Sequence, residues 1–75
     1  MKSNKVGEIM NAIKIGKRLT SLRGTTPQEE VAKTVGISVS ALSMYETGNR
    51  IPRDEIKVKL ARYYNSTVEQ IFFAN

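Results

Sequence analysis

Two short helical segments, residues 27–35 and 39–47, are separated only by Gly36-Ile37-Ser38. The first segment opens with Thr26-Pro27-Gln28-Glu29, in which the threonine can cap the helix and the proline takes its first position. Ser38 can cap the second segment. A three-residue link that contains glycine makes two helices cross steeply instead of lying antiparallel. This pattern of helix caps and a short link constrains the fold more than any other feature, because it leaves few ways to join the two helices.

Both segments have an apolar side that can face a common core. In the first, Ala32 is small enough to let the second helix approach closely, and Gly36 can adopt the left-handed backbone conformation that the turn needs. Ile37 can fill the corner between the helices. The predicted buried residues of the pair are Val31, Ala32, Val35, Leu42 and Tyr45.

Helical spacing also accounts for the rest of the chain, and no strand pattern of useful length occurs. Asn11 is predicted to cap a first helix that ends at Gly24, behind an N-terminal arm of residues 1–10. A fourth helix is predicted to run from Arg53 or Asp54 to Tyr64. A capping box at residues 67–70 opens a short fifth helix. The predicted apolar stripes of these three helices are Ile15, Leu19 and Leu22; Ile56, Leu60 and Tyr63 or Tyr64; and Ile71 and Phe72. The sequence therefore predicts an all-α domain of five short helices over residues 11–75.

Composition narrows the range of possible functions. The chain has 75 residues and a net charge of +5, which suits a polyanionic partner, nucleic acid first and an anionic membrane surface second. A soluble surface that is merely basic is the alternative. Cysteine and histidine are both absent, which removes the commonest metal ligands and general base. The paired carboxylates Glu29-Glu30 and Asp54-Glu55 fall in first helical turns, where the helix dipole favours negative charge. No enzyme activity, metal or cofactor is expected, and no segment is apolar enough to span a membrane.

The outward side of the segment 39–47 indicates what the pair of helices does. If Leu42 and Tyr45 point inward, four uncharged side chains point outward: Val39, Ser40, Ser43 and Met44. A merely solvated helix usually carries Lys, Glu or Gln there. Hydroxyls and small aliphatic groups suit the edges of bases in the major groove of DNA. Packing against another protein is the alternative interpretation.

The order of these motifs resembles the phage-repressor and Cro-like helix-turn-helix family, also called the xenobiotic-response-element type. The resemblance rests on Gln28-Glu29-Glu30-Val31-Ala32, Gly36-Ile37-Ser38 and the run from Ser43 to Pro52. It covers about residues 15–72, and it implies a lambda-repressor-like domain whose second and third helices form the motif, over about residues 27–46. It also implies sequence-specific binding of double-stranded DNA in transcriptional control.

The resemblance assigns roles to individual residues. Gln28 matches a family glutamine that contacts phosphate and braces the reading helix. Arg53 and Lys33 are weaker candidates for phosphate contacts. The positions that face bases in the family are Ser38, Val39, Ser40, Ser43 and Met44, and those of the loop that grips phosphate are Thr47, Asn49 and Arg50.

Arg23 and Glu46 resemble the ion pair that joins the first helix to the end of the third in this family. The link before Gln28 is shorter here than the family pattern, so Arg18 is an alternative partner for Glu46. A second departure is that the reading positions lack the Gln or Arg that would make bidentate contacts to bases.

The resulting expectation is a homodimeric repressor that occupies a palindromic operator in a bacterial or phage-encoded, cytoplasmic and nucleoid-associated setting. Ile71, Phe72 and Phe73 are the candidates for the dimer surface, since three large apolar side chains in a row cannot all face one core. The alternative is an antitoxin-like module that also binds DNA and engages a protein partner through its arm or its Phe72-Phe73 tail.

Overall fold

The computed structural model describes residues 5–74, and within this range every regular element is a helix and there is no strand. The sequence-based prediction of an all-helical fold is confirmed. The elements are α1 (Lys5–Arg23), α2 (Gln28–Val35), α3 (Val39–Glu46), α4 (Asp54–Tyr63) and the short π-helical turn η1 (Glu69–Phe73).

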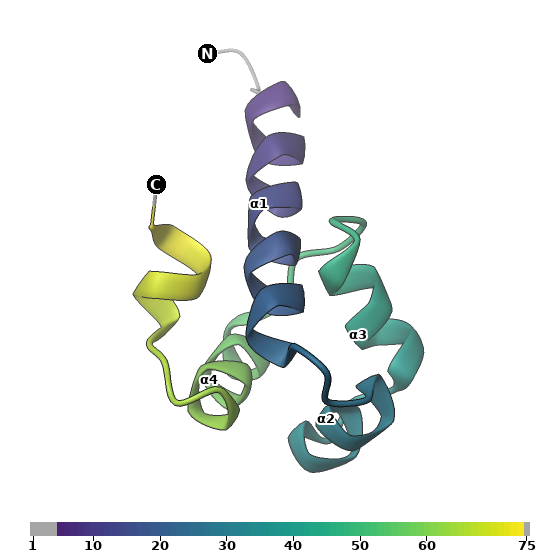
Figure 1. The fold of residues 1–75 in the computed structure, drawn as a ribbon. Helices are drawn as coiled ribbons and strands as arrows, with labels where there is room; N and C mark the ends of the chain where they lie inside the picture. Colours follow the sequence, from purple (N-terminus) through teal and green to yellow (C-terminus); the bar gives the residue numbers. More distant parts are fainter. Residues whose placement is uncertain (1–4, 75) are drawn as a thin grey trace.

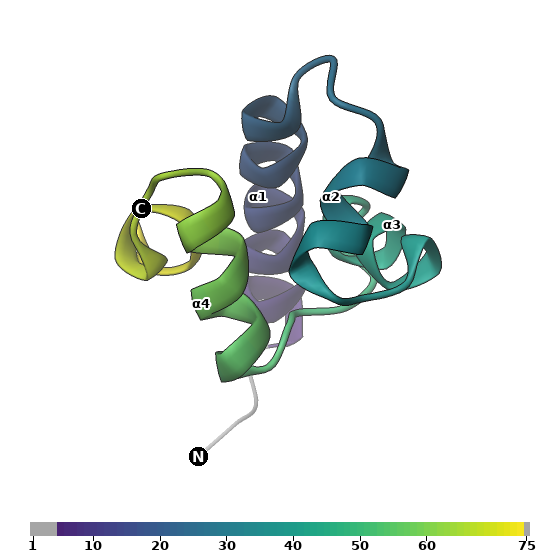
Figure 2. The same ribbon diagram turned by 90° about the horizontal axis from the view of Figure 1, so that it is seen from below.

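The long helix α1 runs through the middle of the molecule. Helices α2 and α3 lie on one side of it, and α4 and η1 lie on the other (Figures 1 and 2). Helix α1 packs on α3 and η1, while α2 packs on α3 and α4. The side chains that these contacts seal most completely are Ile15, Leu19, Val31, Leu42, Leu60, Ile71 and Phe72. The stripes predicted for the helix pair, including Ala32 and Tyr45, all contribute to this core.

Helix α1 begins earlier than the sequence analysis predicted. It is already helical at Lys5, so Asn11 is an exposed residue within the helix and does not cap it. Residues 5–10 of the predicted arm continue α1, and residues 1–4 lie outside the described residues. The apolar stripe is also shifted, since Ala12 joins Ile15 and Leu19 in the interior and Leu22 is exposed. Helix α1 packs on α3 and η1, and these contacts determine which side of α1 is buried.

The start of α2 also differs by a residue. Pro27, with an extended backbone, occupies the N-cap position, and no side chain caps the helix, so Thr26 is not the cap. The carbonyl of Pro27 accepts the amide hydrogen of Glu30 at 3.1 Å. At the other end of the chain, the Thr67 hydroxyl accepts the amide hydrogen of Gln70 at 3.0 Å, which is one half of the predicted capping box. The Gln70 side chain does not complete the box, because its Oε1 accepts the hydroxyl hydrogen of Ser66 at 3.1 Å.

Arg18 fastens the C-terminal turn to α1. Its guanidinium donates hydrogen bonds to the carbonyl of Ile71 at 2.8 Å and to that of Ala74 at 2.6 Å. Arg18 is therefore not the partner of Glu46, which was the alternative that the short link before Gln28 had left open. This contact holds η1 where Ile71 and Phe72 can enter the core.

Candidate nucleic-acid interface

The turn between α2 and α3 has the geometry that its sequence predicts. Gly36 adopts the left-handed conformation with φ at 86° and donates its amide hydrogen to the carbonyl of Ala32 at 2.8 Å. Two residues later, the hydroxyl of Ser38 accepts the amide hydrogen of Ala41 at 3.0 Å and caps α3. Ile37 packs against the core between the two helices. These local contacts set the angle at which α3 leaves α2.

Helix α3 presents an uncharged side to solvent. Leu42 and Tyr45 are buried, whereas Val39 and Met44 are each 40% exposed. Ser40 is exposed and Ser43 is half-buried, so none of the four outward positions is sealed inside the monomer. The helix has no basic residue, and its one carboxylate, Glu46, is buried in an ion pair with Arg23.

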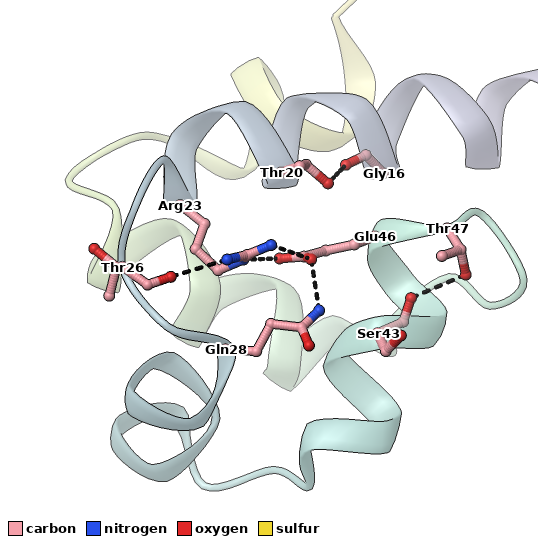
Figure 3. A network of polar contacts seen from close by, with 8 residues as sticks. All are labelled: Gly16, Thr20, Arg23, Thr26, Gln28, Ser43, Glu46 and Thr47. Atoms are coloured by element: carbon pink, nitrogen blue, oxygen red, sulfur yellow. Dashed lines mark hydrogen bonds and ion pairs between the residues drawn. The ribbon is translucent and has the colours of Figure 1, made fainter.

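Glu46 lies at the centre of a polar network that joins three helices (Figure 3). Arg23 of α1 binds it through two hydrogen bonds, with Nε 2.7 Å from Oε2 and Nη2 3.0 Å from Oε1. Gln28 of α2 donates from Nε2 to Oε1 at 2.9 Å. The remaining guanidinium nitrogen of Arg23 donates to the carbonyl of Thr26 at 2.9 Å. The pair that the resemblance predicted is thus present, and Gln28 supports it.

Burial strengthens the interactions of this network, which join α3 to α1 and α2. The Glu46 side chain is only 5% exposed and that of Arg23 only 18%. Hydrogen bonding to Glu46 raises the pKa of Arg23 above its ordinary value, so the guanidinium keeps its charge. A bidentate pair of this kind fixes orientation as well as distance. The network therefore holds the C-terminal end of α3 against α1 and the start of α2.

A glycine that the sequence analysis did not assign brings α1 and α3 together. A Cβ atom added to Gly16 would lie 2.3 Å from the carbonyl oxygen of Glu46 and 2.9 Å from that of Tyr45. Only a residue without a side chain can stand at this crossing. The available signal was a glycine inside an otherwise helical apolar pattern, which often marks close packing.

The loop after α3 is ordered by hydrogen bonds to the helix end. The amide hydrogens of Asn49 and Arg50 are both donated to the carbonyl of Met44, at 2.9 and 3.2 Å. The Thr47 hydroxyl donates to the carbonyl of Ser43, and the Asn49 side chain donates to the Thr47 hydroxyl, both at 2.9 Å. These contacts order the loop that carries the exposed Arg50 directly after α3.

A shallow hollow lies next to the N-terminal end of α3. Ser38 borders it on one side, and Arg50 and Arg53 come from the loop and the start of α4. Arg53 thus shares a concave, basic surface with two residues that the sequence analysis did assign to the site. Lys33 is exposed on α2 and does not line this hollow.

The candidates for the dimer surface need a correction. Ile71 and Phe72 are almost fully buried in the monomer core, so their side chains cannot meet a partner. The turn η1 directs these two inward and leaves Phe73 63% exposed. Lys57 lies over the Phe73 ring, with its ammonium 5.1 Å from the ring centroid. Only Phe73 stays available on the surface.

Among residues 5–74, no three His, Cys, Asp or Glu side chains come together in a way that could hold a metal ion. Within the same range, no helix combines the length and apolar character that a membrane crossing requires.

Comparison with known proteins gives one family match, which covers most of the chain. A family model described as helix-turn-helix (HTH_3) matches residues 17–71, most of the chain. No match was found among curated proteins or solved structures. The matched range includes Arg23, the turn at Gly36, all of α3 and the buried Ile71 of η1. The chain therefore belongs to the Cro-like, XRE-type helix-turn-helix family of DNA-binding transcription regulators.

Proposed function

We propose that this protein is a repressor that binds a specific double-stranded DNA sequence through the exposed side of α3. One observation carries the proposal: the side of α3 formed by Val39, Ser40, Ser43 and Met44 is open to solvent and free of charge. The only carboxylate of α3, Glu46, is buried and neutralised by Arg23. Nothing on the reading side of α3 would therefore repel the phosphates that flank a major groove.

Contacts to phosphate would hold α3 in register on the duplex. The exposed Arg50 and Asn49 follow α3, and Arg53 borders the same basic hollow. The N-terminal amides of α2 and α3 add partial positive charge. Gln28 already donates its side-chain amide to Glu46, so we propose that it acts chiefly as a brace for α3. Its backbone amide is the group that suits phosphate.

We further propose that the protein acts as a homodimer on a palindromic operator. One domain with a few phosphate contacts binds weakly, and a two-fold dimer matches half-sites about 34 Å apart, one turn of the DNA helix. Such a regulator would act in the cytoplasm, on the nucleoid, in a bacterial or phage setting.

Selection of bound duplexes from a random pool, followed by footprinting, tests these proposals together. A palindromic consensus with half-sites one turn apart supports a dimer, whereas a single asymmetric half-site contradicts it. Fluorescence anisotropy on selected and random duplexes at two salt concentrations then measures phosphate contacts, since the log–log slope is about −0.9 per phosphate neutralised. A slope near zero would rule out the proposed mode of binding.

A pair of serine variants locates the DNA-binding side. Ser40→Glu places a carboxylate on the reading side, and Ser21→Glu places the same charge on exposed α1. We expect the first to weaken binding by about 100-fold, because like charges at an interface cost several kcal/mol, and the second to have a far smaller effect. Equal losses in both variants would mean that only net charge matters.

A second candidate function is supported by apolar side chains that stand outside the DNA-binding side. Phe73 is exposed at the C-terminal end, and Ile9 and Met10 are exposed on the projecting turns of α1. An antitoxin-like module could use them to engage a protein partner. A partner captured by Ser40→Glu but lost with Phe73→Ser would favour this function over repression alone.

A further inference from the structure

The exposed side of α3 is arranged in three parallel strips. Helical spacing puts Val39 and Met44 on opposite edges of this side, and Ser40 and Ser43 between them. The two aliphatic groups are equally exposed. A helix entering the major groove along this side would bring a short hydroxyl strip to the base edges, with one aliphatic group on each flank.

Hydroxyl groups alone discriminate poorly among bases. A serine hydroxyl rotates to donate or accept, so it bonds the O4 acceptor of thymine and the N4 donor of cytosine equally well. No Arg, Lys, Asn or Gln lies within α3 to make a bidentate contact with a purine. The feature of a base that this side can distinguish is therefore the 5-methyl group of thymine, which has an apolar counterpart in Val39 and Met44.

Resting on the proposed DNA binding, we propose that Val39 and Met44 determine specificity by reading methyl groups at the 5-position of pyrimidines. Each side chain covers one methyl group in the groove. The base is accepted because it carries that methyl, whatever group stands at its 4-position. This assignment predicts that uracil and cytosine are rejected where thymine is bound, and that 5-methylcytosine recovers part of the affinity that cytosine loses.

Replacement of thymine by uracil tests the assignment most directly. Uracil pairs with adenine as thymine does and differs only in the missing methyl group. In the selected operator, each thymine is replaced singly by uracil, and binding is measured by anisotropy. We expect about fourfold weaker binding at each thymine whose methyl is covered, because burial of one such group contributes about 0.8 kcal/mol.

Two substitutions on α3 connect each methyl group to its side chain. Val39→Thr keeps the shape of valine but replaces a methyl by a hydroxyl, and Met44→Gln keeps the length of methionine. Each should reduce the uracil effect at one position in each half-site and preserve it at the other. This coupling separates direct contact from a change in DNA stiffness, which neither substitution would remove.

Matched controls lie elsewhere on the surface. Val58 on α4 is 39% exposed, almost the same as Val39, and Met10 on α1 is 55% exposed. Val58→Thr and Met10→Gln should leave both affinity and the uracil effect unchanged. Thermal melting verifies that all four variants are folded, as expected for substitutions at exposed positions.

The outcomes distinguish this inference from the proposed function. Sequence-specific binding with no uracil-sensitive thymine would overturn methyl reading and leave DNA binding intact. An unchanged uracil effect in both α3 variants would also overturn it, since the methyl groups would then contact something else. Failure to bind any duplex would overturn the proposed function itself. Recovery by 5-methylcytosine at a site where cytosine weakens binding supports the assignment.

Discussion

The two halves of α1 have very different surroundings although they form one continuous helix. From Gly16 to Arg23 the helix is pressed against α3 and is held by the ion pair to Glu46. Further toward the N-terminus it projects past the other helices (Figure 1). There, Ile9 and Met10 are more than half exposed. The C-terminal part of α1 positions α3, whereas the residues just before Ala12, the first described residue of α1 that is buried in the core, are exposed.

This contrast shows how a small domain can fix one functional helix. A core of this size gives the domain only modest stability, so the orientation of α3 depends on a few specific contacts. Here those contacts are a side-chain-free crossing at Gly16 and a bidentate pair at Arg23. Both act on the last residue of α3, which leaves its N-terminal and outward parts open.

The largest effect should come from Gly16→Ala. The added methyl would overlap the carbonyl oxygen of Glu46, a backbone atom that cannot swing aside. We expect a loss of about 3 kcal/mol in the free energy of unfolding, as for other overpacked sites. Urea unfolding measures it, with Asn11→Ala on the exposed part of α1 as the control, expected within about 0.5 kcal/mol of the parent. Equal stability of the two variants would show that α1 and α3 are not in tight contact.

A smaller but still large effect is expected from Arg23→Met. The substitution leaves the buried Glu46 carboxylate with Gln28 as its remaining side-chain donor. Because Arg23 is partly exposed, we expect a loss of about 2 kcal/mol, less than for a fully buried pair. The double variant Arg23→Met/Glu46→Met should recover part of that loss, since no charge then stays buried. A double variant less stable than Arg23→Met would contradict this account.

A smaller change in stability is expected from a substitution at Tyr64. Its hydroxyl is buried and has no hydrogen-bond partner. Tyr64→Phe removes this unsatisfied group, so at pH 7 we expect no loss of stability and a gain of at most about 1 kcal/mol. A loss of more than about 1 kcal/mol in thermal or urea unfolding would mean that the hydroxyl has a hydrogen-bond partner in solution.

The same residue predicts a dependence of stability on pH. Burial raises the pKa of Tyr64 to about 12, from 10.0 in the unfolded chain. The folded state therefore holds the proton more tightly, and this contribution is complete below pH 10 and disappears as the pH rises toward 12. Unfolding measured between pH 9 and 12 should show a steeper decline for the parent than for Tyr64→Phe. Parallel curves would contradict the raised pKa.

The smallest effect is expected at an exposed side chain near the start of α1. Met10→Gln changes an exposed side chain with no described partner in the core, so stability should stay within about 0.5 kcal/mol of the parent. DNA affinity should not change either. A clear loss of stability that depends on protein concentration would show instead that a second copy covers this part of α1.

Much of the helix-turn-helix could be predicted because its signals are local. Gly36 and the Ser38 cap lie within a few residues of the atoms they contact, and the inward positions Leu42 and Tyr45 follow from helical spacing. The same spacing placed Val39 and Met44 outside. The start of α1 could not be predicted in this way, because a plausible cap at Asn11 does not prevent a helix from continuing toward the N-terminus.

Other features depend on residues far apart in the chain. Arg18 and Arg23 are both suitable partners for Glu46, and only the packing of η1 on α1 assigns Arg18 to the carbonyls of residues 71 and 74. The burial of Ile71 and Phe72 follows from the same contact. Gly16 looks like any helical glycine until α3 is placed across it.

The order of helices, the turn and the outward side of α3 were determined by the sequence alone, since each depends on spacing and capping within one or two helical turns. Tertiary structure decided which arginine binds Glu46, at which position α1 must lack a side chain, and which apolar side chains near the C-terminus are buried in the core. Those outcomes depend on distances between segments that local periodicity does not specify.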